Sequence, residues 1–264
     1  MKGFGEKNQS KKEITSKNEK KINIGKLIKK AFELQSQGKK LEAAKYYAYL
    51  IKQGIKDYRV FSNYGIFLNE IGKHKESELK LKKAISLNPK YANAYYNLAV
   101  VFIGQGNLEK AELELKKAIK LKSDFAIAHY NLGFILKDKG RFKEAESHTQ
   151  KALEFDPQLT DAYLSLSTMQ GVDKSQKWHD QLFSENILKN KNNRELVNIF
   201  FARSNIFHRK KQYEESAENL INANNIKLRM HKSEANLLID KTKKLKISSE
   251  NYERNNQEFK NYPM

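Results

Sequence analysis

Residue types that support enzyme chemistry occur in this sequence, but not at the spacings that such chemistry requires. The chain contains six His and 31 Asp and Glu, and it contains no Cys. The lack of Cys excludes disulfides, cysteine zinc sites, iron–sulfur centres and thiol catalysis. There is no GxxxxGK[ST] phosphate loop and no HExxH metal motif, and Gly104-Gln105-Gly106 lacks the third glycine of a dinucleotide fingerprint. We therefore expect no catalytic residue, no metal site and no cofactor.

The histidines and the closest carboxylates are better explained by packing and solvation. His129 follows Tyr95 by 34 residues and Phe61 by twice that, so a packed core position is expected for it. Glu112 and Glu114 are two residues apart, and side chains at that spacing on a helix do not face each other. We expect both carboxylates on a solvated face rich in ion pairs. Positions on helix surfaces or in turns are expected for His74, His148 and His208.

One polar residue recurs at a regular spacing. Asn63, Asn97 and Asn131 are each separated by 34 residues. A side-chain amide carries both donors and an acceptor, so it can pair with a peptide group on both sides. If these residues lie on equivalent faces of neighbouring helices, they could hold an extended chain without reading its side chains. The alternative is that Asn has only a structural role at this position.

Glycines and small residues define the elements that would position these asparagines. A small residue stands seven positions before each of four regularly spaced glycines, and another stands five positions after it. This spacing predicts two helices joined by a tight glycine turn, with small residues that let the helices approach closely. In the third unit, the stripe that faces back from the second helix is Ala111, Leu115 and Ala118. The four glycines are Gly38, Gly72, Gly106 and Gly140.

The 34-residue pattern resembles the tetratricopeptide repeat (TPR). The resemblance covers residues 24–57, 58–91, 92–125 and 126–159. It implies an all-α, right-handed solenoid of antiparallel helix hairpins, in which stacking of the hairpins makes a continuous core. It also implies that the first helix of each hairpin lines a concave groove that binds a protein or a peptide.

The repeat becomes irregular after residue 159 and returns near the end of the chain. Residues 160–196 carry no turn glycine in phase, and residues 178–188 are expected to form an irregular second helix. In residues 197–230, Ser216, Leu220 and Ala223 are expected to form a packing stripe on the second helix. The predicted organisation is a disordered Lys-rich arm at 1–22, four regular TPRs at 23–159, divergent TPR-like units at 160–230, a capping helix at 231–248 and a loose tail at 249–264.

The TPR register implies which residues face the groove. Repeat positions 2, 5, 6, 9 and 12–13 point there in TPR proteins. The asparagines occupy position 6, which resembles the asparagine ladder of the O-linked N-acetylglucosamine transferase. At positions 5 and 9, Tyr96, Tyr130 and Phe134 could form an aromatic floor of the groove, and inter-helix packing is the alternative role for position 9. The expected peptide-binding residues are Asn63, Asn97, Asn131, Tyr96, Tyr130 and Arg59.

The carboxylate clamp of chaperone-binding TPRs does not fit this sequence. That clamp uses Lys at position 5 and Asn at position 9, whereas this chain has Ser62 and Ile66, and then Tyr96 and Val100. Arg59 alone matches. Capture of an acidic C-terminal tail by that mechanism is therefore not expected.

A second resemblance concerns the order of the segments. A Lys-rich arm, four TPRs, a divergent stretch, the segment 200–225 and a charged helix resemble the N-terminal half of bacterial TPR–sulfotransferase fusion proteins. In that family a catalytic domain with a phosphosulfate-binding loop follows, and no catalytic residue can be carried over here. We expect a non-catalytic scaffold or adaptor that binds a peptide or protein. The alternative is the substrate-binding half of a split or truncated TPR–sulfotransferase.

The charge of the chain is strongly basic, with 50 Lys and Arg against 31 Asp and Glu, a net charge of +19. Lysine far outnumbers arginine, whereas phosphate and base recognition favours arginine. No specific nucleic-acid binding is therefore expected, although the Lys-rich arm could make weak contact with an anionic membrane. The sequence has no apolar signal segment and no apolar span, which favours a cytoplasmic protein. It leaves the oligomeric state and the ligand open.

Overall fold

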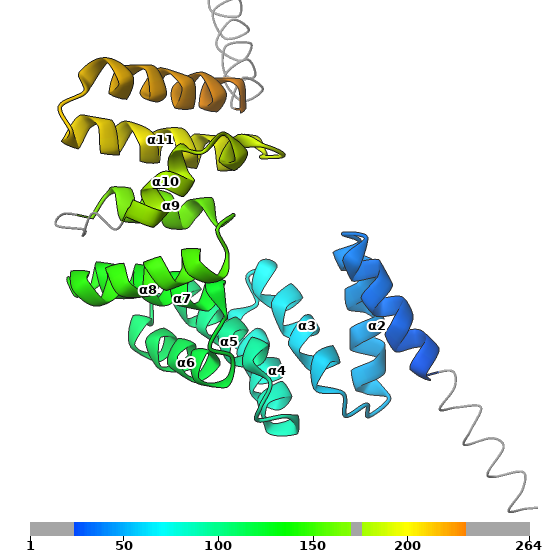
Figure 1. Ribbon diagram of the computed structural model, residues 1–264. Coiled ribbons are helices and arrows are strands. Elements are labelled where there is room, and N and C mark those ends of the chain that lie inside the picture. Colours follow the sequence, from blue (N-terminus) through cyan, green and yellow to red (C-terminus); the bar gives the residue numbers. More distant parts are fainter. Residues whose placement is uncertain (1–23, 170–175, 231–264) are drawn as a thin grey trace, which may run out of the picture. The chain divides into compact units, whose positions relative to one another are not determined.

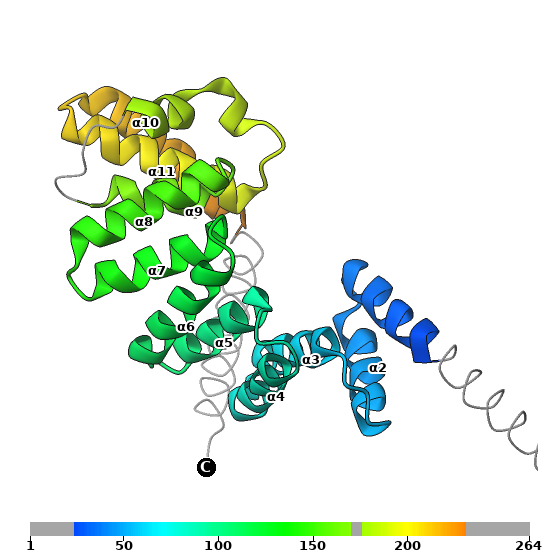
Figure 2. The same cartoon turned by 60° about the horizontal axis from the view of Figure 1, so that its bottom comes forward.

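The computed structural model describes residues 24–169 and 176–230. All regular secondary structure in these residues is helical (Figures 1 and 2). None of the helices described is both long and apolar enough to cross a membrane. The predicted arm at 1–22, the capping helix at 231–248 and the tail at 249–264 lie outside the described residues.

The chain forms two compact units, with the boundary between His148 and Thr149. Unit 1 is built from successive helix hairpins whose two helices lie side by side in both views. In chain order its helices are residues 24–36, α2 (Lys40–Lys52), α3 (Tyr58–Glu70), α4 (His74–Leu87), α5 (Ala92–Gly104), α6 (Leu108–Leu121), α7 (Ala126–Asp138) and α8 (Phe142–Phe155), which continues past the boundary.

The glycine turns have the conformation that their spacing predicts. Gly106 has φ +72°, its N–H donates to the Ile103 carbonyl at 2.9 Å, and the Asn107 N–H donates to the Phe102 carbonyl at 2.8 Å. This pair of bonds satisfies carbonyls at the end of α5 and reverses the chain within three residues. Positive φ values of 73–77° occur at the equivalent positions Gly38, Gly72 and Gly140.

Small residues bring the two helices of a hairpin into close contact, as predicted. A Cβ atom at Gly65 of α3 would lie 2.8 Å from Cγ of Leu81 on α4, which is too close. The Ser77 hydroxyl of α4 donates to the Gly65 carbonyl at 2.7 Å. In the next hairpin, Ala111 and Leu115 are fully buried on α6. The small side chains therefore set the spacing of the helices.

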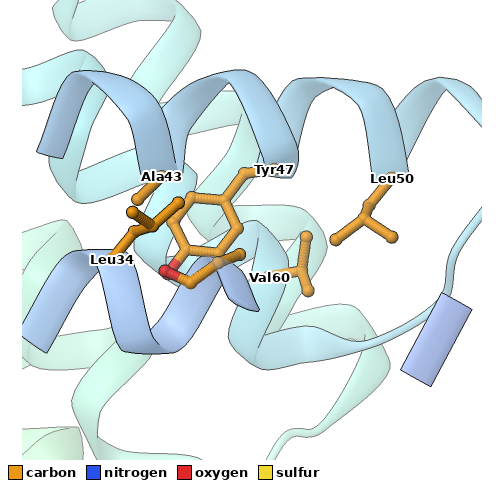
Figure 3. Close-up of a cluster of buried hydrophobic side chains, with 6 residues drawn as sticks. Leu34, Ala43, Tyr47, Leu50 and Val60 are labelled. Carbon is orange, nitrogen blue, oxygen red and sulfur yellow. The ribbon is translucent and has the colours of Figure 1, made fainter. Parts of the chain in front are cut away.

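The core of the first hairpin is organised around one tyrosine (Figure 3). Tyr47 of α2 is fully buried, and its ring lies among Leu34, Ala43 and Val60. Figure 3 shows the ring between the two helices, with its hydroxyl next to the helix that carries Leu34. The apolar ring thus supplies packing, while the hydroxyl is held near the first helix.

The expectation that Glu112 and Glu114 lie on a solvated face is wrong. Each is only 8% exposed on α6. Glu112 accepts hydrogen bonds from Lys116 at 2.7 Å, Lys139 at 2.9 Å and Arg141 at 2.8 Å. Burial opposes ionisation of Glu112, but these three cations outweigh it and lower its pKa to about 2. The next glycine turn supplies two of the cations, which is why the carboxylate can be buried.

His129 is buried, as its position in the repeat predicts. Its Nε2 lies 3.0 Å from the Ser123 carbonyl oxygen, and its Nδ1 lies 2.9 Å from Nδ1 of His148. His148 is half-buried in this contact rather than a plain surface residue. Both histidines therefore take part in the packing of α7 against α8.

Unit 2 contains the divergent part of the chain. Its remaining helices are α9 (Thr160–Ser167), α10 (Gln176–Phe183), the short 3-10 helix η1 (Glu185–Leu188), α11 (Asn193–Arg209) and a helix over residues 213–230. The predicted irregular second helix at 178–188 is confirmed, because α10 ends early and η1 follows it. A capping box between Asn192 and Glu195 starts α11.

Two arginines of α11 hold the ends of the irregular helices. Arg203 donates to the carbonyls of Leu182 at 2.9 Å and Ser184 at 3.2 Å, and Arg209 donates to the Met169 carbonyl at 2.8 Å. Carbonyls at helix C-terminal ends lack intrahelical donors and favour cations. The two arginine side chains therefore donate to backbone carbonyls near helix ends, a role that backbone N–H groups of the glycine turns have in the regular repeats.

The final hairpin follows the regular pattern, except that Lys211 stands in its turn in place of a glycine and Leu220 is exposed on its second helix. Lys211 occupies the turn position with φ +61°, and it repeats the bonding of the glycine turns, with its N–H donating to His208 at 3.0 Å. Ser204 and Ser216 bridge α11 and the last helix through their hydroxyls and carbonyls. Leu220 was expected in the packing stripe, but it is 43% exposed.

Candidate functional site

The predicted binding residues of unit 1 lie on three successive first helices. Asn63 is on α3, Asn97 on α5 and Asn131 on α7, and each is half-buried. Because the repeats share one register, these side chains occupy equivalent positions on neighbouring helices. The structure therefore places one amide in each of three repeats.

The asparagine amides also connect neighbouring repeats. Asn97 donates from Nδ2 to the Ser62 hydroxyl at 3.2 Å, and Asn131 donates to the Tyr96 hydroxyl at 3.4 Å. In both cases the acceptor is 35 residues earlier, on the preceding first helix. Asn97 and Asn131 therefore have a structural role, which the sequence analysis gave as the alternative to peptide binding. One hydrogen bond uses only part of an amide, which has two donors and an acceptor.

The predicted aromatic residues differ in their surroundings. Tyr96 is half-buried, its ring lies 5.1 Å from that of Phe125, and burial raises the pKa of its hydroxyl. Tyr130 is half-buried on α7. Phe134, one turn further along α7 at repeat position 9, is 48% exposed. About half of the Phe134 side chain is therefore accessible for contact outside its own hairpin.

Arg59 is held in place at the start of α3. Its guanidinium forms two hydrogen bonds with Asp57, at 3.1 Å and 2.7 Å, and lies 5.3 Å from the ring centroid of Phe32. Burial opposes ionisation of Asp57, but Arg59 outweighs it, so the pKa of Asp57 is lowered. The charge of Arg59 is therefore largely paired with the residue that caps its own helix.

The structure adds a small pocket that sequence reasoning missed. It has a volume of about 40 Å³, and Asn63 is the one polar residue of its lining that was predicted, whereas Gln35 and Tyr47 were among those missed. Gln35 occupies repeat position 12, which the TPR register assigns to the groove, so that signal was available. Tyr47 is on the second helix, and no repeat position pointed to it. The lining residues are Gln35, Lys40, Ala43, Tyr47, Asn63, Ile66, Phe67 and Glu70.

No group of three or more His, Asp or Glu in the described ranges is arranged to hold a metal ion. The site of unit 1 instead offers amides, hydroxyls and exposed apolar side chains. Such groups bind partners by hydrogen bonding and apolar packing.

Two family models match the regular repeats. A model described as TPR repeat matches residues 68–106 and 101–140, and one described as tetratricopeptide repeat matches residues 126–159. Both describe repeats and neither describes a catalytic domain, so the resemblance to TPR–sulfotransferase fusions stays a prediction. No curated protein sequence matches the chain.

Solved structures show the same fold at low sequence identity. PilF of Pseudomonas aeruginosa is 13% identical, with a TM-score of 0.59, and the match covers 74% of this chain and 88% of that one. A tetratricopeptide repeat protein from Parabacteroides merdae is 19% identical, with a TM-score of 0.53 and coverage of 78% and 79%. Helix hairpins, glycine turns, the repeat matches and these structures agree: the chain is an all-α TPR solenoid, with tetratricopeptide repeats matched across residues 68–159.

Proposed function

We propose that unit 1 binds an extended segment of a partner protein along its first helices, so that the chain acts as a non-catalytic scaffold or adaptor. TPR solenoids use their concave surfaces for protein interactions. The proposed contacts are made by Asn63, Asn97, Asn131, Tyr96, Tyr130 and Arg59, the residues predicted from the register, together with Phe134.

The observation that carries this proposal is the arrangement of the asparagines. Within the described part of the chain, the amides of Asn97 and Asn131 each make one hydrogen bond, to the preceding repeat. That bond fixes the orientation of the amide and leaves a carbonyl oxygen and one N–H. Those two groups complement the N–H and the C=O of a peptide. An extended chain can therefore be bound at successive repeats by its backbone.

Phe134 supplies an apolar contact for a side chain of the bound segment. Exposed aromatic residues are the usual anchors of protein recognition. Phe134 lies on the same helix as Asn131, and burying its exposed half in a complex would remove apolar surface from water.

The test compares two exposed apolar residues on different helices. The partner is recovered by affinity capture with the full chain, and its affinity is then measured by calorimetry. Phe134→Ala should weaken binding at least about tenfold. Leu113→Ala is the matched control, because Leu113 is 53% exposed but lies on the second helix α6, and it should leave the affinity unchanged.

Two outcomes would redirect the proposal. Loss of affinity in Leu113→Ala, with none in Phe134→Ala, would place the interaction on the second helices. Capture of a separate sulfotransferase catalytic chain would favour the split-enzyme alternative.

A further inference from the structure

We infer that the pocket between the first two hairpins of unit 1 takes the side-chain carboxamide of a Gln or Asn in the bound segment. This inference rests on the proposed function, because it takes the ligand to be a peptide. The pocket is formed by the helix at 24–36, α2 and α3, and its uncharged polar groups come from Gln35, Tyr47 and Asn63.

A chain of hydrogen bonds determines which amide atoms of Gln35 and Asn63 are available to a ligand in the pocket. Asn63 donates from Nδ2 to the Tyr47 hydroxyl at 3.3 Å, and that hydroxyl donates to Oε1 of Gln35. The Ala31 carbonyl, at 3.4 Å, is a longer second acceptor for the hydroxyl. With Gln35 Oε1 and Asn63 Nδ2 turned toward the tyrosine, Gln35 Nε2 and Asn63 Oδ1 remain for a ligand. The pocket thus offers donors from one amide and an acceptor from the other.

A carboxamide matches this pair of amides. Its carbonyl oxygen can accept from Gln35 Nε2, and its NH₂ can donate to Asn63 Oδ1. A carboxylate would place oxygen against the Asn63 oxygen, and an ammonium group would place N–H donors against the Gln35 amide. Either charged group would leave a polar atom unpaired on binding, which costs more than the bond it replaces.

The charges around the pocket also favour a neutral group. Burial raises the pKa of Tyr47 above its ordinary value near 10, so its hydroxyl keeps its proton at neutral pH. At the rim, Lys40 and Glu70 pair with each other at 2.7 Å. The rim therefore presents a neutralised ion pair, and the interior presents uncharged hydrogen-bonding groups.

Size sets a further limit. A cavity needs about 10–15 Å³ to hold one water molecule, so the pocket, with about 40 Å³, has room for a few waters or for one small planar group. Ala43, Ile66 and Phe67 line it as apolar walls that can contact the methylene groups of a Gln or Asn side chain.

The test uses three small probes that differ only in the side chain: the N-acetyl N-methylamides of glutamine, glutamate and leucine. The full chain is labelled with ¹⁵N, and the side-chain amide signals of Gln35 and Asn63 are followed at pH 7. The glutamine probe should shift both signals saturably. The other two should bind at least about fivefold more weakly, because each lost hydrogen bond is worth about two- to tenfold in affinity.

Variants show whether the hydrogen-bond chain is responsible. Tyr47→Phe keeps the ring and removes the hydroxyl, so the preference for glutamine should be lost. Tyr163→Phe is the matched control in unit 2, where another buried tyrosine donates to a glutamine, Gln181, at 3.2 Å, and it should preserve the preference. Should Tyr47→Phe fail to fold, Gln35→Leu removes the donor amide at a half-buried position.

Equal binding of the three probes, unshifted pocket signals, or a glutamine preference that survives both Tyr47→Phe and Gln35→Leu would overturn the inference. These outcomes leave the proposed function untouched, because that is tested separately by Phe134→Ala with the captured partner. If Phe134→Ala instead left the affinity for the partner unchanged, the proposed function would be contradicted, even if the glutamine probe still bound.

Discussion

The amide of Asn97 donates to the Ser62 hydroxyl at 3.2 Å, although the two residues are 35 positions apart in the chain. Ser62 is fully buried on α3, and Asn97 is on α5. The bond therefore joins two repeats beneath the face proposed to bind a peptide. The same amide thus joins two repeats and, in the proposed function, uses its remaining donor and acceptor to bind the peptide.

Removing this amide should destabilise the fold as well as weaken binding. Asn97→Ala is expected to lower the free energy of unfolding by about 0.5–1.5 kcal/mol, because the buried Ser62 hydroxyl loses its partner. The measurement is urea unfolding followed by circular dichroism. Asn224→Ala is the control at an exposed helical position, where Ala is the better helix former and the stability should stay equal or rise slightly. Equal effects of the two variants would argue against a structural role for Asn97.

A charge in the contact between two helices should be severely destabilising. Ala111 is fully buried on α6, so Ala111→Arg forces both excess volume and an unpaired charge into the core and should cost more than about 3 kcal/mol. Lys110→Arg, at the exposed neighbouring position, should change the stability little. Thermal unfolding of the two variants makes the comparison, and an unchanged melting temperature for Ala111→Arg would contradict the helix register.

Lys211 should be a point where the fold can be stabilised. It has φ +61° in a turn whose equivalents are glycines, and a left-handed conformation costs an L-residue about 1–2 kcal/mol. Lys211→Gly relieves this strain but loosens the unfolded chain, so a net gain of about 0.5–1 kcal/mol is expected. The converse is Gly106→Ala. A Cβ at Gly106 meets no atom within 4 Å, so its expected loss of about 1 kcal/mol comes from conformation alone. Urea unfolding checks both signs.

Acid should weaken the ion pairs around Glu112. Its pKa is lowered to about 2 from an ordinary 4.5, so it contributes stability above pH 4.5 that is lost as the pH falls toward 2. Glu112→Gln should therefore lower the free energy of unfolding at pH 7 by about 1–3 kcal/mol, and the difference from the unsubstituted protein should shrink between pH 4.5 and 2. Glu76→Gln is the control for an exposed ion pair, with Lys73 at 3.0 Å. A difference for Glu112→Gln that is constant with pH would show that its charge is not involved.

The sequence by itself determined the helix hairpins and their turns. Gly106 and its equivalents predicted where each chain reversal falls, and Ala111 predicted a close helix contact. The turn conformation and the helix face that carries Ala111 are local features. A positive φ depends on the residue that adopts it, and a helix face depends on spacing along one helix. The same periodicity placed Asn63, Asn97 and Asn131 on equivalent positions of successive helices.

Tertiary structure alone decided which groups from different repeats meet. Periodicity did not show that Asn97 donates to Ser62, or that Gln35, Tyr47 and Asn63 enclose one pocket. These contacts depend on distances between helices that are far apart in the chain. The same reason explains an error of sequence reasoning. Glu112 is buried because cations arrive from the following turn.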